Sequence, residues 1–145
     1  MKLADKNLEV KVERTIPATP DELFDGWLDP KVPGNPWNAA EKLILDAKVD
    51  GLFYWLIMGM AHYGRFTEME RPARIQHTWM SPNTLGRESI VTVTFQQQGD
   101  ETVMTLTHKG LPDTEEGRSH DGGWNYFLDL FLEKTRDRLG KKSPS

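Results

Sequence analysis

The strongest hydrophobic pattern in the chain lies near its C-terminus, in residues 122–139 (GGWNYFLDLFLEKTRDRL). A helical wheel gathers a stripe within one third of its circumference, made of Trp124, Phe127, Leu128, Phe131, Thr135 and Leu139. The far side is polar and is expected to face water, with Asn125, Asp129, Glu133 and Arg136. The stripe is unusually bulky for one helix. It forms either the buried face of an ordinary amphipathic helix or one wall of a pocket, and both interpretations require a sheet.

The N-terminal pattern predicts a strand followed by a helix. Residues 8–16 alternate between apolar and polar positions, although Arg14 shares the apolar face. Thr19 is a good N-cap for a helix over residues 20–28, since Pro20 then occupies the first helical position. Residues 31–39 are rich in proline and glycine and predict a loop with at most one helical turn. Trp37 in this loop either plugs the edge of a core or lines a ligand entrance.

The pattern in the middle of the chain predicts successive antiparallel strands. The predicted strands are one around Leu43 and Leu45, then residues 52–58, 61–69, 75–79, 89–97 and 102–108. Residues 52–58 are apolar on both faces, as in a central strand covered on both sides or a pocket wall. Residues 111–121 are polar and predict a connector. A strand, a helix, five or six strands and a final helix indicate an α+β fold, with one sheet curling around the last helix.

Composition narrows the function classes. The chain has 145 residues, a formal net charge of −4, no basic run or patch and no cysteine. These features predict a single domain over about residues 8–139 with a loose tail, 140–145, and no nucleic-acid partner. No apolar run reaches the roughly 20 residues of a membrane span and no signal peptide precedes Val10, so we expect no membrane association. The lack of cysteine excludes disulfides and a thiol nucleophile within this chain, and we expect a cytoplasmic protein.

Four segments carry a resemblance to a known family. Residues 17–24 (PATPDELF) resemble the strand-to-helix entry of START-like, helix-grip (SRPBCC) domains, which are related to the birch-pollen allergen and to polyketide cyclases. Residues 46–53 (DAKVDGLF) resemble the signature D-x-R-x-G-G-x-F of one branch, with Lys48 and Asp50 as departures. Residues 64–75 (GRFTEMERPARI) resemble its G-x-x-x-E-x-x-x-P-x-R-I segment, and residues 123–128 (GWNYFL) its G-W-x-x-x-L. That branch is similar to the C-terminal domain of the activator of the heat-shock-protein-90 ATPase.

The resemblance spans about residues 8–139 and implies a specific architecture. It implies a curved antiparallel sheet of six to seven strands that grips the C-terminal helix, with short N-terminal helices and a cavity between sheet and helix. In the family, that cavity binds lipids, hormones or aromatic natural products and in some members hosts chemistry. The resemblance therefore leaves the function open.

No catalytic constellation stands out among the candidate polar residues. None of the histidines has metal-ligand spacing, and no carboxylate pair brackets them: His62, His77, His108 and His120. His108 ends an inward-facing series, as a general base or as a hydrogen-bonded pocket histidine; we favour the second because the sequence names no orienting partner. His77 beside Trp79 has the same interpretation, and His120 is expected at the rim. We predict no catalytic residue, no metal and no cofactor.

Two charged residues interrupt apolar faces. Arg14 either reaches solvent at a strand end or is buried, and a buried guanidinium must find a carboxylate. Glu68 shares the predicted face of Gly64 and Phe66, so we predict a buried ion pair between Arg14 and Glu68, with Glu70 as the alternative partner. An unpaired Arg14 facing the cavity would bind a ligand carboxylate.

Three function classes remain: a small-molecule binding module, an enzyme of cyclase or hydrolase type, and a co-chaperone-like interaction domain. We favour binding of a small hydrophobic or aromatic molecule. The candidate cavity residues are Trp37, Trp55, Phe66, His77, Trp79, Phe95, His108, Trp124, Phe127 and Phe131. An enzyme would use His77, His108 or Glu68. Tyr126 and Leu130 lie outside the helical stripe and offer a surface for a homodimer, and a chaperone-type partner is the third alternative.

Overall fold

The sheet consists of seven antiparallel strands, and β1 pairs with β7 so that the first and last strands are neighbours. The computed structural model describes residues 7–140. The strand order is β1-β7-β6-β5-β4-β3-β2. The strands are β1 (Asn7–Ile16), β2 (Lys42–Leu45), β3 (Leu52–Ile57), β4 (Met60–Glu70), β5 (Arg74–Trp79), β6 (Ser89–Gln98) and β7 (Glu101–Pro112). Apart from the β1–β7 pairing, each strand pairs with its sequence neighbour, so the predicted meander and the α+β class are confirmed.

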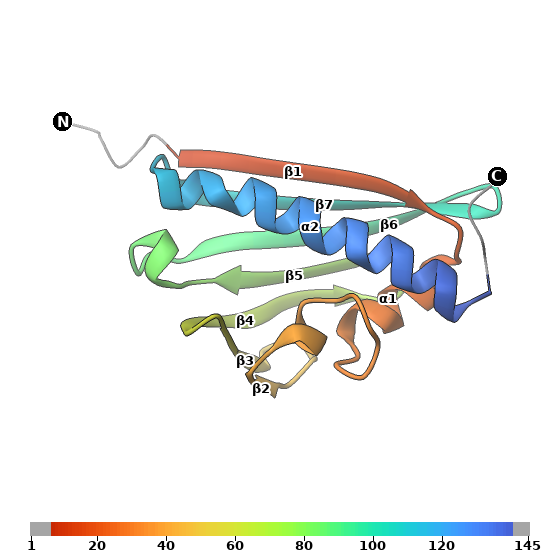
Figure 1. Cartoon of the computed structure of the whole chain (residues 1–145), viewed down its shortest axis with the longest axis horizontal. Coiled ribbons are helices and arrows are strands. Elements are labelled where there is room, and N and C mark those ends of the chain that lie inside the picture. Colours follow the sequence, from red (N-terminus) through yellow and green to blue (C-terminus); the bar gives the residue numbers. More distant parts are fainter. Residues whose placement is uncertain (1–6, 141–145) are drawn as a thin grey trace.

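One face of the sheet is covered by the long helix α2 (Glu115–Arg138), which crosses it diagonally (Figure 1). The short helix α1 (Pro20–Leu28) and the chain that follows it lie beside the C-terminal half of α2 (Figure 1). The core lies between these helices and the inward side chains of the strands, and it includes the fully buried Phe66, Leu106 and Phe131. The helical stripe predicted from the sequence is buried from Trp124 to Thr135.

The N-terminal predictions hold at the level of single residues. The Thr19 side chain accepts a hydrogen bond from the Glu22 amide, and the Glu22 carboxylate accepts one from the Thr19 amide, so both ends of this capping box are formed. The following loop contains the single turn η2 (Trp37–Ala39). Asn35 fixes the loop because its buried amide donates to the carbonyl oxygens of Gly26 and Asp29, at 2.7 and 2.8 Å.

One prediction about an element was wrong, and another left two alternatives that the structure separates. Helix α2 begins at Glu115, capped by the Thr114 side chain, whereas residues 111–121 had been predicted as a connector. The polar composition and the glycines of this stretch favoured a connector, although it contains an N-cap residue followed by two acidic residues, as the first turn of a helix does. Of the two interpretations of residues 52–58, the pocket wall is correct: Trp55, Ile57 and Met58 line a pocket, whereas β3 lies next to the edge strand and Leu52 on its outer face is 62% exposed. The predicted loose tail beyond Gly140 lies outside the described residues.

The predicted ion pair between Arg14 and Glu68 is also wrong. A β-bulge between Phe66 and Glu68 inserts one extra residue into β4, so Glu68 lies opposite Gln76 on the outer face of the sheet. There Glu68 accepts from Arg74 at 2.8 Å. Arg14 lies on the inner face of the edge strand β1 and reaches α2 instead, where it donates to Asp129 at 2.7 Å and to Asn125 at 2.8 Å.

Candidate functional site

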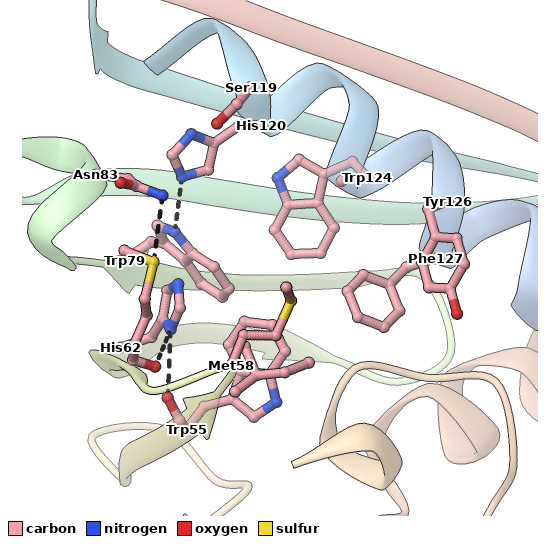
Figure 2. Close-up of a pocket in the computed structure, with 13 residues that line it drawn as sticks. Trp55, Met58, His62, Trp79, Asn83, Ser119, His120, Trp124, Tyr126 and Phe127 are labelled. Carbon is pink, nitrogen blue, oxygen red and sulfur yellow. Dashed lines mark hydrogen bonds between the residues drawn. The ribbon is translucent and has the colours of Figure 1, made fainter. Parts of the chain in front are cut away.

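A pocket of about 460 Å³ opens between the N-terminal half of α2 and the hairpin of β3 and β4 (Figure 2). Its walls come from six positions of α2, from β3 to β5 and from the turn η3 (Pro82–Thr84). The lining residues are Trp55, Ile57, Met58, Met60, His62, Trp79, Asn83, Ser119, His120, Gly123, Trp124, Tyr126 and Phe127. None of these side chains is a carboxylate, a lysine or an arginine. The pocket is therefore apolar, with a few polar groups from histidine, asparagine, serine and tyrosine.

Aromatic rings form most of the wall. The Trp79 ring lies 5.1 Å from that of Trp124 and 5.3 Å from that of Trp55, between ring centroids. Phe127 continues this surface at 6.0 Å from Trp55. The four rings come from both the sheet and α2, and they point toward one another across the pocket in Figure 2. They lie at contact distance and present flat aromatic faces to the pocket.

A chain of hydrogen bonds behind the wall orients two of these indoles. The Trp124 Nε1–H donates to Nδ1 of His108 at 3.0 Å. The Ser89 hydroxyl donates to the Trp79 carbonyl oxygen, so its own oxygen accepts from Nε2 of His108 at 2.7 Å. The Trp79 Nε1–H donates to Nε2 of His120 at 3.3 Å. Each donor and acceptor in this series of hydrogen bonds can act as described only when His108 and His120 are both neutral.

Two pocket histidines use the same ring nitrogen to anchor themselves to the backbone. Nδ1 of His120 donates to the carbonyl oxygen of Gly117 at 3.0 Å. Nδ1 of His62 faces the carbonyl oxygens of Met60 and Trp55 at 3.2 and 3.3 Å, and two carbonyl acceptors require it to carry the proton. Nε2 of His62 is then an acceptor, and it has no partner among residues 7–140.

Burial keeps these histidines uncharged at neutral pH. Desolvation lowers the pKa of His108 from 6.5 to about 2, with further lowering by the nearby His120 and His77. Desolvation also lowers the pKa of His77 to about 4. The pKa values of His62 and His120 are lowered by burial as well, although hydrogen bonds to backbone carbonyls oppose the shift. The pocket is therefore electrically neutral at pH 7.

The candidate residues from the sequence divide into two groups. Four line the pocket: Trp55, Trp79, Trp124 and Phe127. Six are buried but do not line it: Trp37, Phe66, His77, Phe95, His108 and Phe131. Trp37 fills the core beside Phe53, with ring centroids 5.1 Å apart, so of its two interpretations the plug is correct. His108 stands behind the wall and orients Trp124.

The sequence analysis missed His62 and the lip formed by Met58 and Met60, and it expected His120 only at the rim. His62 has the same parity along β4 as the inward-facing Phe66, so strand alternation could have identified it. His120 precedes Trp124 by four residues and extends the helical stripe by one turn. The helix was predicted to start at residue 122, after His120, so this relation was not recognised. The lip depends on how far the hairpin projects, for which the sequence carries no signal.

Residues 7–140 contain no group of three or more histidine, aspartate or glutamate side chains arranged to hold a metal ion. No helix in the same range is long and apolar enough to cross a bilayer.

The order of elements and the site between sheet and helix can now be compared with known proteins. The sequence profile described as activator of Hsp90 ATPase homolog 1-like protein matches residues 17–135. The chain belongs to this family. No curated protein matches the sequence.

Solved structures share the fold of this family member. CalU16 from Micromonospora echinospora is 20% identical with a TM-score of 0.73, and the match covers 94% of this chain and 81% of that one. PFC0360w, an HSP90 activator from Plasmodium falciparum, is 23% identical with a TM-score of 0.70, covering 93% and 98%. The Aha1 dimer from Colwellia psychrerythraea is 11% identical with a TM-score of 0.69, covering 87% and 94%. At these identities the likeness shows the fold, and the predicted helix-grip architecture is confirmed.

Proposed function

We propose that this protein binds a small hydrophobic or aromatic molecule in the pocket between α2 and the hairpin of β3 and β4. The observation that carries this proposal is an open pocket of about 460 Å³ whose walls include five tryptophan, tyrosine and phenylalanine side chains and no charged group. Ligand sites of proteins have volumes of roughly 300–1,000 Å³ and combine apolar walls with a few placed polar groups. A plain core would have filled this space with side chains.

Two neighbouring glycines allow a direct test. Gly123 lines the pocket and Gly122 does not, and a Cβ atom at either position would meet no atom within 4 Å. Gly123→Phe places a ring at the pocket wall, whereas Gly122→Phe adds the same ring elsewhere on the helix. We expect naphthalene to bind the wild type and Gly122→Phe. Quenching of tryptophan fluorescence measures this binding. Gly123→Phe should lose binding at least tenfold, and equal binding by both variants would contradict the proposal.

The site gives less support to catalysis. His62 and His120 are the titratable groups in the pocket, and each spends Nδ1 on backbone carbonyls rather than on an orienting carboxylate. A general base is most effective when its pKa lies near the working pH, and burial lowers both pKa values from 6.5. Binding therefore accounts for the arrangement without a chemical step.

A second candidate function is contact with a protein partner, because the outer face of the sheet carries an apolar row. Ile44 lies opposite Tyr54, and Tyr54 lies opposite Tyr63, so the three side chains are neighbours across β2, β3 and β4. Ile44 is 66% exposed and Tyr63 is 48% exposed. Because one structural neighbour is an HSP90 activator, ATP hydrolysis by Hsp90 is the assay. Stimulation that Ile44→Lys abolishes would support this function, and no effect on the rate would contradict it.

A further inference from the structure

We infer that the ligand is an uncharged aromatic molecule that donates a hydrogen bond, as a phenolic hydroxyl or an aromatic N–H does, and that Nε2 of His62 receives it. This inference rests on the proposed function and names the class of ligand for that site. It follows from an account of the donors and acceptors that the pocket offers, and from the charge of its walls.

The indole donors of the pocket are all used by the protein itself. Trp55 Nε1–H donates to the carbonyl oxygen of Pro36 at 2.8 Å. Trp79 and Trp124 donate to His120 and His108, as described above. Indole nitrogen is a donor only, so these three side chains present their faces to a ligand and no polar atom. Their contribution is stacking.

The other hydrogens on the walls are largely committed as well. The Ser119 hydroxyl donates to the carbonyl oxygen of Glu116 at 2.6 Å. The Asn83 amide nitrogen donates to Sδ of Met60 at 3.7 Å. The hydroxyl of Tyr126 belongs to a side chain that is 61% exposed, on the opposite side of the pocket from His62 in Figure 2. A ligand whose polar atoms only accept hydrogen bonds finds few donors here.

His62 differs because it is buried and retains an unused acceptor. The residue is 6% exposed and lies at the bottom of the pocket. In Figure 2 its Nδ1 faces the two carbonyl oxygens, and Nε2 lies on the opposite edge of the ring, toward Trp79. Nε2 has no hydrogen-bond partner among the described residues and is not fully shielded from solvent, so it is accessible to a ligand donor, which would supply the missing hydrogen bond. The Trp55 and Trp79 rings pack against the His62 ring at 4.6 and 4.9 Å between centroids, and all three side chains line the same pocket.

The neutral walls exclude two other classes of aromatic ligand. A carboxylate or sulfonate would be desolvated without a cation to pair with. An organic cation would gain from the tryptophan faces, but no carboxylate lines the pocket to complete its site. A neutral donor matches both the aromatic walls and the unpartnered acceptor at Nε2 of His62.

The test uses five probes, each titrated into the protein at neutral pH by calorimetry. Four are naphthalenes that differ in a single substituent, and the fifth is an organic cation. Naphthalene reports the proposed function, because it requires only the apolar walls. Comparing 2-naphthol with 2-methoxynaphthalene reports the hydrogen bond, because the methyl ether keeps the oxygen and loses the donor. 2-Naphthoate and benzyltrimethylammonium report the exclusion of charge. We expect 2-naphthol to bind roughly tenfold more tightly than 2-methoxynaphthalene, as one hydrogen bond gives.

The His62→Phe variant provides a second measurement. It should abolish the roughly tenfold preference for 2-naphthol over 2-methoxynaphthalene, and this ratio is compared within the variant so that a change in pocket shape affects both probes alike. A third measurement uses the wild type and therefore does not depend on the folding of a variant. In protein labelled with ¹⁵N-histidine, the Nε2 resonance of His62 should shift on addition of 2-naphthol and not on addition of naphthalene. Equal affinities for 2-naphthol and its methyl ether, or tightest binding of either charged probe, would overturn the inference while naphthalene binding upheld the proposed function. Failure of all the probes to bind would overturn both.

Discussion

The two ends of the space between α2 and the sheet are both aromatic, yet only one of them is open. At the closed end, Trp27 of α1 packs on Phe131 of α2 with ring centroids 5.1 Å apart. At the open end, Trp79 of β5 packs on Trp124 of α2 at the same separation of 5.1 Å. Ring contacts therefore do not distinguish a filled core from a pocket wall.

The difference lies in what covers the rings. At the closed end the chain after α1 presses on α2 so closely that a Cβ at Gly34, with φ of +102°, would lie 2.9 Å from the Phe131 Cα. At the open end the covering position is taken by Gly123, which has no side chain, and by the projecting hairpin at Met58. An aromatic stripe becomes a pocket wall where its cover is missing, which is a property of other segments of the chain.

Truncating one ring at each end should give the largest contrast. Phe131→Ala removes a fully buried ring from the closed end and should lower the free energy of unfolding by about 3–5 kcal/mol. Phe127→Ala should cost about half as much, because one side of this ring already borders empty space. Urea unfolding of both variants measures the difference. Equal losses would mean that the open end is packed as a core.

Acid should destabilise the protein through its buried histidines. Burial makes the folded-state pKa lower than the unfolded value of 6.5, so the unfolded chain binds more protons below that pH and stability falls as pH falls. Above 6.5 both states are neutral and the effect vanishes. At about pH 5, His108 and His77 should each reduce the unfolding free energy by about 2 kcal/mol relative to pH 7. Urea unfolding at the two pH values measures the sum.

The His108→Gln variant isolates the contribution of His108 to this loss of stability in acid. A glutamine amide can accept from Trp124 and donate to Ser89 without titrating. The variant should therefore lose about 2 kcal/mol of the difference between pH 7 and about pH 5. An unchanged pH dependence would show that His108 is protonated in the folded protein.

Alanine at the paired glycines should produce a smaller effect of opposite sign. Glycine within a helix costs about 1 kcal/mol relative to alanine, and neither Gly122 nor Gly123 has a neighbour within 4 Å of a Cβ. Both Gly122→Ala and Gly123→Ala should raise the free energy of unfolding by about that amount. Only Gly123→Ala should also weaken naphthalene binding, because only Gly123 lines the pocket. Loss of binding in both variants would place the effect in the helix as a whole.

Local patterns predicted the fold well because each one depends on nearby residues. The alternation in β1, the Thr19 cap and the helical stripe from Trp124 are all formed by the structure. The Arg14 prediction failed because parity along β4 holds only up to the bulge after Phe66. A bulge is set by pairing with the neighbouring strand, and the sequence of β4 alone does not reveal it.

The site was less predictable than the fold because it depends on which side chains are left uncovered as well as on which side chains are present. The sequence identified rings such as Trp79 and Phe127 but could not separate them from core rings such as Phe95, which packs against Phe24 under α1. Which rings are covered depends on where the loop after α1 and the hairpin of β3 and β4 lie in space. The hydrogen-bond roles of His62 and His108 depend on that same packing.

The smallest expected effect concerns the lip of the pocket. Met58 and Gly59 form the two-residue turn between β3 and β4, with φ of 51° and 73°, a conformation that asparagine adopts more readily than methionine. Met58→Asn should raise the free energy of unfolding by about 0.5 kcal/mol and weaken naphthalene binding about twofold, because an apolar lip is lost. Leu85→Asn is the matched control, since Leu85 has φ of 59° and is exposed but does not line the pocket. Equal weakening by Leu85→Asn, or unchanged binding in Met58→Asn, would contradict a specific role of Met58 in covering the ligand, and Gly123 would then be the position that defines the open end.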